Sequence, residues 1–203
     1  MKKYEKPLYS LIPLDTFKAV LGLDDREDKL ATFCLVSSTF SIEQYCKRRL
    51  LRKRHFEKIE FIGDLFLPFL EYPVNKVLAV YSLPCMGRGE SQIVEPELYS
   101  VIPEEGTLDD VPFSLSFSRA LLRYKGIAAI KAVYLAGYNA SNVPPDLSMA
   151  CLELSAWNLN RYKGRRIGMT GNVRGKGKDG ENFEMSMPEN VRALLEPYRR
   201  KLI

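Results

Sequence analysis

Two adjoining stretches decide the fold class: GIAAIKAVYLA at residues 126–136 and VPPDL at residues 143–147. The first is an aliphatic and β-branched run of the kind that forms β-strands. In the second, proline is tolerated in the first turn of a helix, and the carboxylate of Asp146 faces the positive end of the helix dipole. An apolar stripe at helical spacing then runs from Leu147 to Trp157. The chain therefore passes here from a β-rich region into helices.

The sequence before residue 126 is also β-rich. Aromatic and β-branched runs cover residues 56–62, 65–70 and 74–81. Prolines interrupt this region at Pro73, Pro84, Pro96, Pro103 and Pro112. Because proline removes a donor from the hydrogen-bond ladder, we expect short strands with long, partly acidic connections over residues 55–138, rather than one regular sheet.

Helices are predicted on both sides of this region. Over residues 14–50, a short helix ends at Gly22, which supplies a left-handed stop, and a longer helix follows from Asp28. The predicted apolar face of the longer helix consists of Leu30, Phe33, Cys34, Phe40 and Tyr45. Two more helices are predicted at residues 145–163 and 188–198, and Pro197 is expected to bend or end the last one. Residues 164–187, rich in glycine and bases, are predicted to form a flexible loop.

These elements predict an α+β fold in one domain over residues 1–203. Helices from both ends pack as a small bundle, with the β-rich middle region beside it. The helices that pack together begin near Asp15, Asp28, Asp146 and Pro188. The predicted core consists of Phe17, Leu21, Leu30, Phe33, Leu147, Leu154, Trp157, Val191 and Leu194.

The composition is typical of a globular protein, with 46% hydrophobic and 27% charged residues in 203. No apolar run approaches the ~20 residues that a membrane-spanning helix needs, and no signal-peptide apolar core follows Met1. We therefore expect a protein that is cytoplasmic when made.

Residues that bind metals or carry redox chemistry are scarce. His55 is the one histidine, so a multi-histidine metal site is excluded, and its alternating surroundings favour an exposed strand residue over a catalytic one. The cysteines are Cys34, Cys46, Cys85 and Cys151, too widely spaced for a metal or redox motif. Cys34 and Cys151 lie among apolar helical positions and are expected to be small core residues.

A glycine-rich stretch at residues 171–177 fails the test for a P-loop. Its first spacing is one residue short, and Gly177 replaces the Ser or Thr that binds magnesium. No nucleophile elbow is present either. We predict that the protein is not an enzyme and has no cofactor and no bound metal.

The net charge of +5 is modest, but the bases are concentrated in two runs. Residues 47–54 form either a solvated helix end or a contact with a polyanion. Residues 161–178 carry seven bases and no acid: Arg161, Lys163, Arg165, Arg166, Arg174, Lys176 and Lys178. On a glycine-rich backbone these bases would either follow a phosphate surface or remain a solvated loop.

Three stretches of the sequence form a pattern when taken together. The first comprises residues 14–23 and the helix that bears IEQYCKR at 42–48; the second is IKAVYLAGY at 130–138 running into VPPDLSMA at 143–150; the third is MPENV at 187–191 with LLEPYRR at 194–200. In this order and spacing, and with YPV at 72–74 as a fourth similar feature, they resemble the head-tail connector family of tailed bacteriophages and prophages, whose members form a ring under the portal. The region 84–110 departs from this pattern, because it is longer and more acidic than we expect of a compact family member.

The resemblance implies a structural protein of virion assembly and head completion, a connector domain over residues 1–203. Its subunits would form a ring, expected to be a dodecamer, on the portal protein and join the DNA-filled head to the tail. The implied partners are copies of the chain itself, the portal protein, a tail-completion or stopper protein and non-specifically contacted genomic DNA, with no membrane. The protein would occupy the host cytoplasm during assembly and then the head-tail junction of the virion.

The residues expected to contact the portal by this resemblance are Tyr198, Arg199, Arg200, Leu202 and Ile203. Those expected to face the DNA channel are Lys163, Arg165, Arg166, Arg174, Lys176 and Lys178. The alternative function is a cytoplasmic, sequence-nonspecific nucleic-acid-binding protein that uses the two basic runs.

Overall fold

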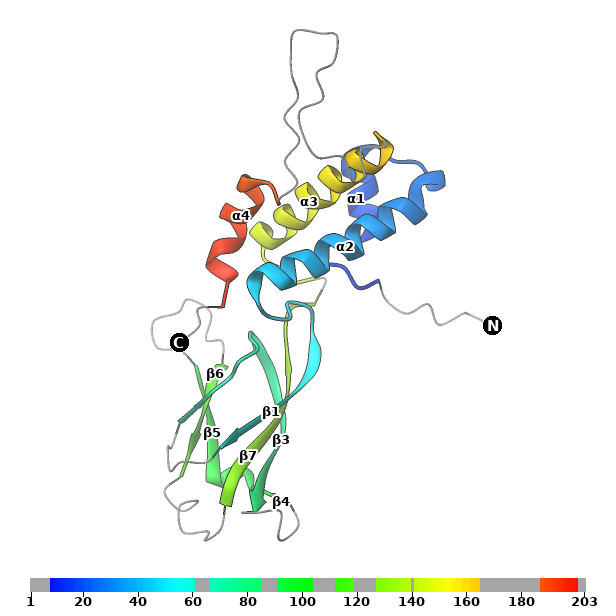
Figure 1. Ribbon diagram of the computed structural model, residues 1–203. Coiled ribbons are helices and arrows are strands. Elements are labelled where there is room, and N and C mark those ends of the chain that lie inside the picture. Colours follow the sequence, from blue (N-terminus) through cyan, green and yellow to red (C-terminus); the bar gives the residue numbers. More distant parts are fainter. Residues whose placement is uncertain are drawn as a thin grey trace, which may run out of the picture. The chain divides into compact units, whose positions relative to one another are not determined.

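The computed structural model describes residues 8–60, 66–84, 91–103, 112–118, 127–139, 141–164 and 187–200 (Figure 1). The chain divides into two compact units, Met1–Arg48 with Ala140–Ile203 and Arg49–Asn139. The first unit contains the described α-helices and the second contains the described strands, and we call them the helical unit and the sheet unit. The predicted α+β class is confirmed, whereas a single connector domain over residues 1–203 stays a prediction.

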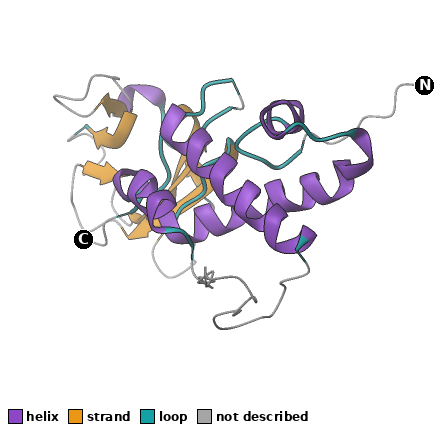
Figure 2. Ribbon diagram, turned by 90° about the horizontal axis from the view of Figure 1, so that it is seen from above, coloured by secondary structure: helices purple, strands orange, loops and turns teal. Residues whose placement is uncertain are grey.

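The helical unit consists of α1 (Leu14–Leu21), the 3-10 turn η1 (Asp25–Glu27), α2 (Asp28–Cys46), α3 (Pro145–Lys163), α4 (Glu189–Leu195) and the 3-10 turn η5 (Glu196–Tyr198). The two long helices, α2 and α3, run antiparallel, with α1 packed on α2 and α4 packed on α3 (Figures 1 and 2). Helices from both ends of the chain therefore pack together, as predicted. Gly22 ends α1 with a φ of 63°, and α4 gives way at Leu195 to the turn that contains Pro197, as the glycine and proline signals predicted.

The apolar face predicted for α2 is wrong at its aromatic positions, because Phe33 is 54% exposed and Phe40 is 43% exposed. The buried face instead consists of Ala31, Cys34, Leu35, Ser38, Thr39, Ile42, Glu43 and Cys46. Small and polar side chains suit a face against which α3 packs: the Asn158 amide of α3 donates to Ser38 Oγ over 3.0 Å, and Thr39 Oγ1 lies 3.7 Å from Cys151 Sγ. The aromatic rings pack on neighbouring rings at the surface, Phe33 on Tyr162 and Phe40 on Tyr9.

Four of the predicted core residues are fully buried in the helical unit: Phe17, Leu147, Leu154 and Val191. Leu30, Trp157 and Leu194 are only partly buried. Leu21 is exposed, and its assignment to the core is wrong because α1 is a short helix that buries Phe17 and no other residue.

The sheet unit contains two antiparallel sheets. Its strands are β1 (Lys53–Glu60), β2 (Phe66–Pro68), β3 (Val74–Pro84), β4 (Gln92–Ile93), β5 (Tyr99–Pro103), β6 (Pro112–Phe117) and β7 (Ile127–Ala136), and a 3-10 turn, η3 (Pro96–Leu98), precedes β5. The strand orders are β1-β7-β3-β4 and β2-β6-β5. The expectation of short strands is wrong for β3 and β7, which have 11 and 10 residues, because Pro73 and Pro84 lie only at the ends of the β3 run and no proline lies within the β7 run.

Alternation along β7 gives the large sheet an inner face and an outer face. Ile130, Ala132, Tyr134 and Ala136 point inward and join one hydrophobic cluster with Leu115 and Phe117 of β6. This cluster packs the two sheets against each other. By register, Arg54, Phe56 and Lys58 of β1 share the outer face with Lys131, Val133 and Leu135 of β7.

A glycine closes the sheet unit where β7 ends. Gly137 has a φ of 105°, and a Cβ added there would lie 2.6 Å from the carbonyl carbon of Leu51. The close approach is held by hydrogen bonds from Tyr138 N–H to the Leu50 carbonyl (2.7 Å) and from Arg52 N–H to the Tyr138 carbonyl (2.9 Å). Only a residue without a side chain fits this backbone crossing.

Candidate interaction sites

The segment predicted to contact a portal is attached to the end of α2. Arg48 is 4% exposed, and its Nε donates a 2.9 Å hydrogen bond to the carbonyl of Tyr198. Two residues further on, Arg200 N–H donates to the carbonyl of Cys46 over 2.9 Å. Lys47 lies between Cys46 and Arg48 in a left-handed conformation, with a φ of 55°, and ends the helix. The backbone of residues 198–200 is therefore held in place by main-chain and guanidinium contacts.

Side chains add a second set of contacts around Tyr45. Its hydroxyl donates to Glu196 over 2.9 Å, and the guanidinium of Arg199 lies 5.5 Å from its ring centroid. The hydrogen bond to the Glu196 carboxylate favours the protonated phenol and raises the pKa of Tyr45. Arg199 also forms a 3.6 Å ion pair with Glu196. These contacts leave Arg199 exposed at the surface, where a partner can reach it.

Of the residues predicted to contact a portal, Tyr198, Arg199 and Arg200 thus lie together beside the end of α2, while Leu202 and Ile203 fall outside the described residues. Sequence reasoning missed Arg48, which holds this segment. The sequence around Arg48 is a run of bases, Lys47 to Arg49, before the apolar pair Leu50 and Leu51, and it carries no signal for a partner 150 positions away.

Of the six bases predicted to face DNA, Lys163 is the one that lies within the residues that the structure describes. Lys163 ends α3 and forms an ion pair with Glu27, while its side chain stays 42% exposed. The other five, Arg165, Arg166, Arg174, Lys176 and Lys178, fall outside the described residues, as do residues 165–186 of the loop predicted over 164–187.

The first basic run is not a solvated helix end, so that interpretation is wrong. The helix stops at Cys46, Arg48 is buried, and Lys53 and Arg54 belong to β1. The backbone N–H of Arg49 donates to Glu71 in the sheet unit over 2.9 Å. The run is instead a chain segment that leaves a helix and enters a strand, and its exposed bases beyond Arg49 lie on the sheet unit.

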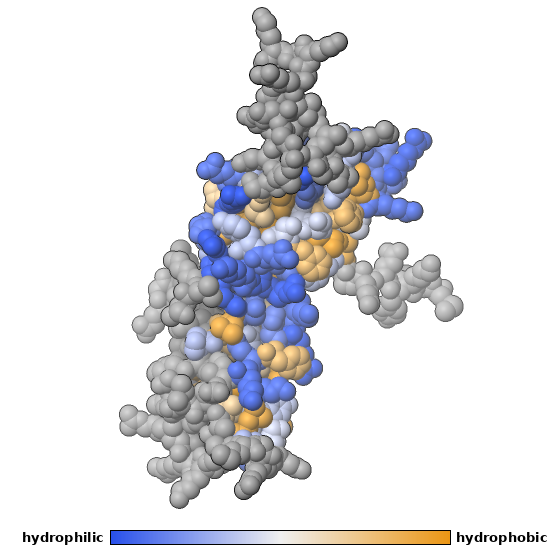
Figure 3. Space-filling view, in the orientation of Figure 1, coloured by the Kyte–Doolittle hydropathy of each residue, from blue (hydrophilic) through white to orange (hydrophobic). Residues whose placement is uncertain are grey.

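The outer face of the large sheet mixes cations with apolar side chains. The Arg54 guanidinium lies 5.1 Å and the Lys131 ammonium 5.5 Å from the centroid of the Phe56 ring. Lys131 also lies 6.0 Å from the ring centroid of Tyr81 on β3. Figure 3 shows hydrophobic and hydrophilic patches interspersed on the visible side of the sheet unit. Such cation–aromatic groups are common where proteins bind partners.

A buried polar group organises the inner face of the same sheet. Tyr134 donates to Glu57 over 2.9 Å, and the other Glu57 oxygen accepts the Leu70 N–H over 2.9 Å. Burial, reinforced by the Glu57 charge, raises the pKa of Tyr134. His55 stacks on Tyr134 with ring centroids 5.7 Å apart and is half-buried, so it is a strand residue as predicted but not an exposed one. Each side chain in this group has a packing role.

The expected core cysteines, Cys34 and Cys151, are both buried, as is Cys46, while Cys85 lies outside the described residues. Desolvation raises the pKa of Cys34 and Cys46 to about 11, which makes their thiols poor nucleophiles. Over the described ranges, no three side chains of metal-ligating type are grouped closely enough to hold an ion. In the same ranges, no helix is both long enough and apolar enough to cross a membrane.

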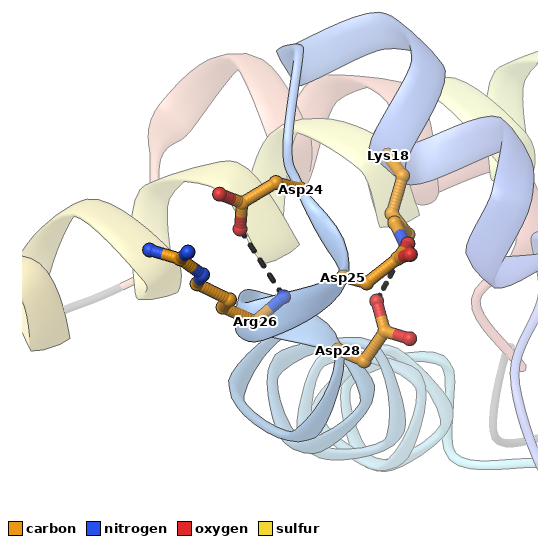
Figure 4. Close-up of polar contacts among 5 residues, drawn as sticks. All are labelled: Lys18, Asp24, Asp25, Arg26 and Asp28. Atoms are coloured by element: carbon orange, nitrogen blue, oxygen red, sulfur yellow. Dashed lines mark hydrogen bonds and ion pairs between the residues drawn. The ribbon is translucent and has the colours of Figure 1, made fainter.

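A two-carboxylate clamp fixes α1 to the start of α2 (Figure 4). Lys18 Nζ lies 2.5 Å from Asp25 Oδ1 and 2.5 Å from Asp28 Oδ1. These hydrogen bonds raise the pKa of Lys18, and the ammonium lowers the pKa of Asp25. Asp24 caps the turn by accepting the N–H of Arg26 over 3.2 Å. The acids that the sequence places here thus order the connection between two helices.

The fold defines an α+β protein with a helical unit and an antiparallel two-sheet unit, whose residues lie in the sequence between α2 and α3. No family model and no curated protein sequence matches the chain. Among solved structures, it resembles a chain of the virion of a native gene transfer agent (GTA) particle, with 18% identity and a TM-score of 0.62 over 100% of this chain and 96% of that chain.

Two further similar chains come from necks of such particles. One belongs to the neck of an empty GTA particle computed with C6 symmetry, with 18% identity and a TM-score of 0.61. The other belongs to the neck of a native GTA particle computed with C12 symmetry, with 17% identity and a TM-score of 0.54. Each match covers 95% of this chain and 91% of the other. At this level of identity the likeness shows a shared fold.

Proposed function

We propose that this chain is a head-tail connector subunit, a non-enzymatic virion protein that forms a ring on a portal and joins a DNA-filled head to a tail. The observation that carries the proposal is a fold likeness that extends over 95% to 100% of the chain, to proteins of particle necks and virions. A likeness of this extent includes both units, which are therefore used together.

The ring is the second part of the proposal. The similar necks were computed with C6 and C12 symmetry, which agrees with a dodecamer on the portal. Identical subunits in a closed ring contact one another head to tail through two different surfaces. Each neighbouring contact should bury at least about 1,000 Å², the size of a specific interface.

We assign the portal contact to Tyr198, Arg199 and Arg200, with Leu202 and Ile203 continuing the segment. The backbone of residues 198–200 is already anchored by Arg48 and Cys46, so docking on a portal would cost little conformational entropy there. An exposed arginine beside tyrosine rings is the residue type that dominates protein interfaces. The bases from Lys163 to Lys178 are assigned to the DNA path, where each phosphate contact is weak and salt-sensitive.

Electron microscopy of negatively stained particles tests the ring. The purified protein, alone and mixed with its portal, should give rings on the portal with matching rotational symmetry. A two-fold dimer that persists when portal is added would contradict the connector. Tight, salt-sensitive binding of DNA by the isolated monomer, without portal binding, would favour the nucleic-acid-binding alternative.

A further inference from the structure

The two edges of the large sheet carry opposite charges. In the strand order β1-β7-β3-β4, β1 and β4 are the outer strands. Three strand spacings of about 4.8 Å separate them, so groups on the two edges are too far apart to pair within one copy. Each edge also presents an exposed apolar residue on the same outer face of the sheet.

The β1 edge is basic. Arg54, Phe56 and Lys58 alternate with inward-facing residues, and all three are exposed, Phe56 by 62%. Arg54 and Lys131 hold their charges near the Phe56 ring, at 5.1 and 5.5 Å from its centroid. The nearest described acid on this strand, Glu57, is buried on the opposite face against Tyr134. Phe56 is therefore flanked along β1 by the bases Arg54 and Lys58, and the strand ends at Glu60.

We use the term β4 edge for Ile93 together with the segment that follows β4, and this segment is acidic. Ile93 pairs in register with Tyr81, which places it on the outer face, and it is 68% exposed. Glu95 follows two residues after Ile93, Glu97 lies in the turn η3, and both are exposed. In the sequence, residues 89–118 contain no base, so no cation within this stretch neutralises these carboxylates. This edge is an apolar residue followed by anions.

We propose that the β4 edge of one copy docks on the β1 edge of the next, with Ile93 against Phe56 and the carboxylates of Glu95 and Glu97 near Arg54 and Lys58. The inference rests on the proposed connector function and names the subunit contact of the ring. The occupant is a second copy because one chain carries both complementary edges, and two different edges give the head-to-tail contact that closes a ring. Complementary charge sets the register and the partner, and the apolar pair is desolvated between them.

Charge reversal at each edge tests this contact. The proteins compared are wild type, R54E/K58E, E95K/E97K and the control K29E/R192E, which makes the same charge change as the first variant at exposed positions of the helical unit. Their folding is checked by thermal unfolding. Self-association is measured by sedimentation velocity, and the number of copies on the portal is measured in assembled particles. If wild type is monomeric in solution, the particle measurement decides.

Each edge variant alone should associate about tenfold more weakly or load fewer copies, because like charges then meet. An equimolar mixture of the two should recover to within about threefold of wild type, since subunits can alternate with every contact complementary again. The control should match wild type.

Unchanged assembly by either variant, or a mixture that does not recover, would overturn the inference while leaving the connector function intact. Loss of DNA binding by R54E/K58E alone, with no effect of E95K/E97K, would show that a polyanion covers the basic edge. If wild type neither associates nor enters particles, the connector function fails and the inference fails with it.

Discussion

Lys18 shows how one side chain sets the geometry of a helix connection. Its pKa is raised from 10.5 and that of Asp25 is lowered from 3.8, so the two shifts describe one interaction from both partners. The lysine contributes stability that is complete below pH 10.5 and is lost as the pH rises through its folded pKa. The carboxylate contributes stability that is present above pH 3.8 and is lost as the pH falls through its folded pKa.

We therefore predict that Lys18→Met lowers the free energy of unfolding at neutral pH, and that the difference from wild type shrinks as the pH falls below 3.8 and through the folded pKa of Asp25. Urea unfolding of wild type and Lys18→Met from neutral pH into the acid range measures this difference in the free energy of unfolding. The clamp is exposed, so added salt should also reduce the difference. Lys29→Met, at the exposed position next to Asp28, removes a charge that makes no ion pair with the clamp and is the control. A difference that does not change with pH would mean that the Lys18 stem acts by packing alone.

A second prediction concerns Gly137, where the backbone conformation and the neighbouring atoms both exclude a side chain. Gly137→Ala should cost about 3 kcal/mol or more, through strain at positive φ and a clash with the Leu51 backbone. Gly22→Ala is the matched control, since Gly22 also has a positive φ but no atom within 4 Å of an added Cβ, and it should cost about 1 kcal/mol. If the two substitutions lower the free energy of unfolding equally in denaturant, the clash with the Leu51 backbone contributes nothing.

At the scale of elements, α3 is the centre of the helical unit. Leu154 is 3% exposed on its buried face, and Leu154→Ala should destabilise the protein by about 2 to 5 kcal/mol. Met149→Ala, at a position 49% exposed on the same helix, should change stability by less than about 0.5 kcal/mol. Chemical denaturation monitored through Trp157 fluorescence compares the two. If Leu154→Ala behaves like Met149→Ala, the buried face of α3 is misassigned.

Elements that depend on local signals could be predicted from the sequence. The glycine after α1, the prolines before α3 and α4, and the β-branched run of β7 each act within a few residues of their own position. The buried face of α2 could not be predicted, because large apolar residues attract a core assignment, while close packing against α3 selects small ones such as Ala31, Cys34 and Ser38. The same limit applies to the contact of Arg48 with Tyr198, which depends on tertiary folding alone.

At the scale of the whole molecule, the two ends of the last segment are predicted to have separate roles. Deleting residues 199–203 should abolish portal binding, because it removes Arg199 and the anchored backbone. Tyr198→Ala, which keeps the carbonyl that Arg48 binds, and Arg199→Ala should be the costliest single changes, about 2 kcal/mol or more each. Arg192→Ala, exposed on α4, is the control. Binding to immobilised portal measures all four.

Neutralising the bases Lys163, Arg165, Arg166, Arg174, Lys176 and Lys178 should leave portal binding intact. It should reduce DNA retention in assembled heads and weaken its dependence on salt. If the neutralised protein loses portal binding while DNA retention is unchanged, or the tail deletion still binds portal, the two roles are assigned to the wrong segments.

The backbone crossing at Leu50, Leu51 and Tyr138 has an evolutionary consequence. Residues 49–139 enter and leave their unit at neighbouring points, joined by hydrogen bonds of 2.7 and 2.9 Å. A segment whose ends meet can be acquired by or lost from a host domain without displacing the residues on either side. Residues 49–139 meet this geometric condition for an insertion, because the chain leaves the helical unit after Arg48 and returns to it at Ala140.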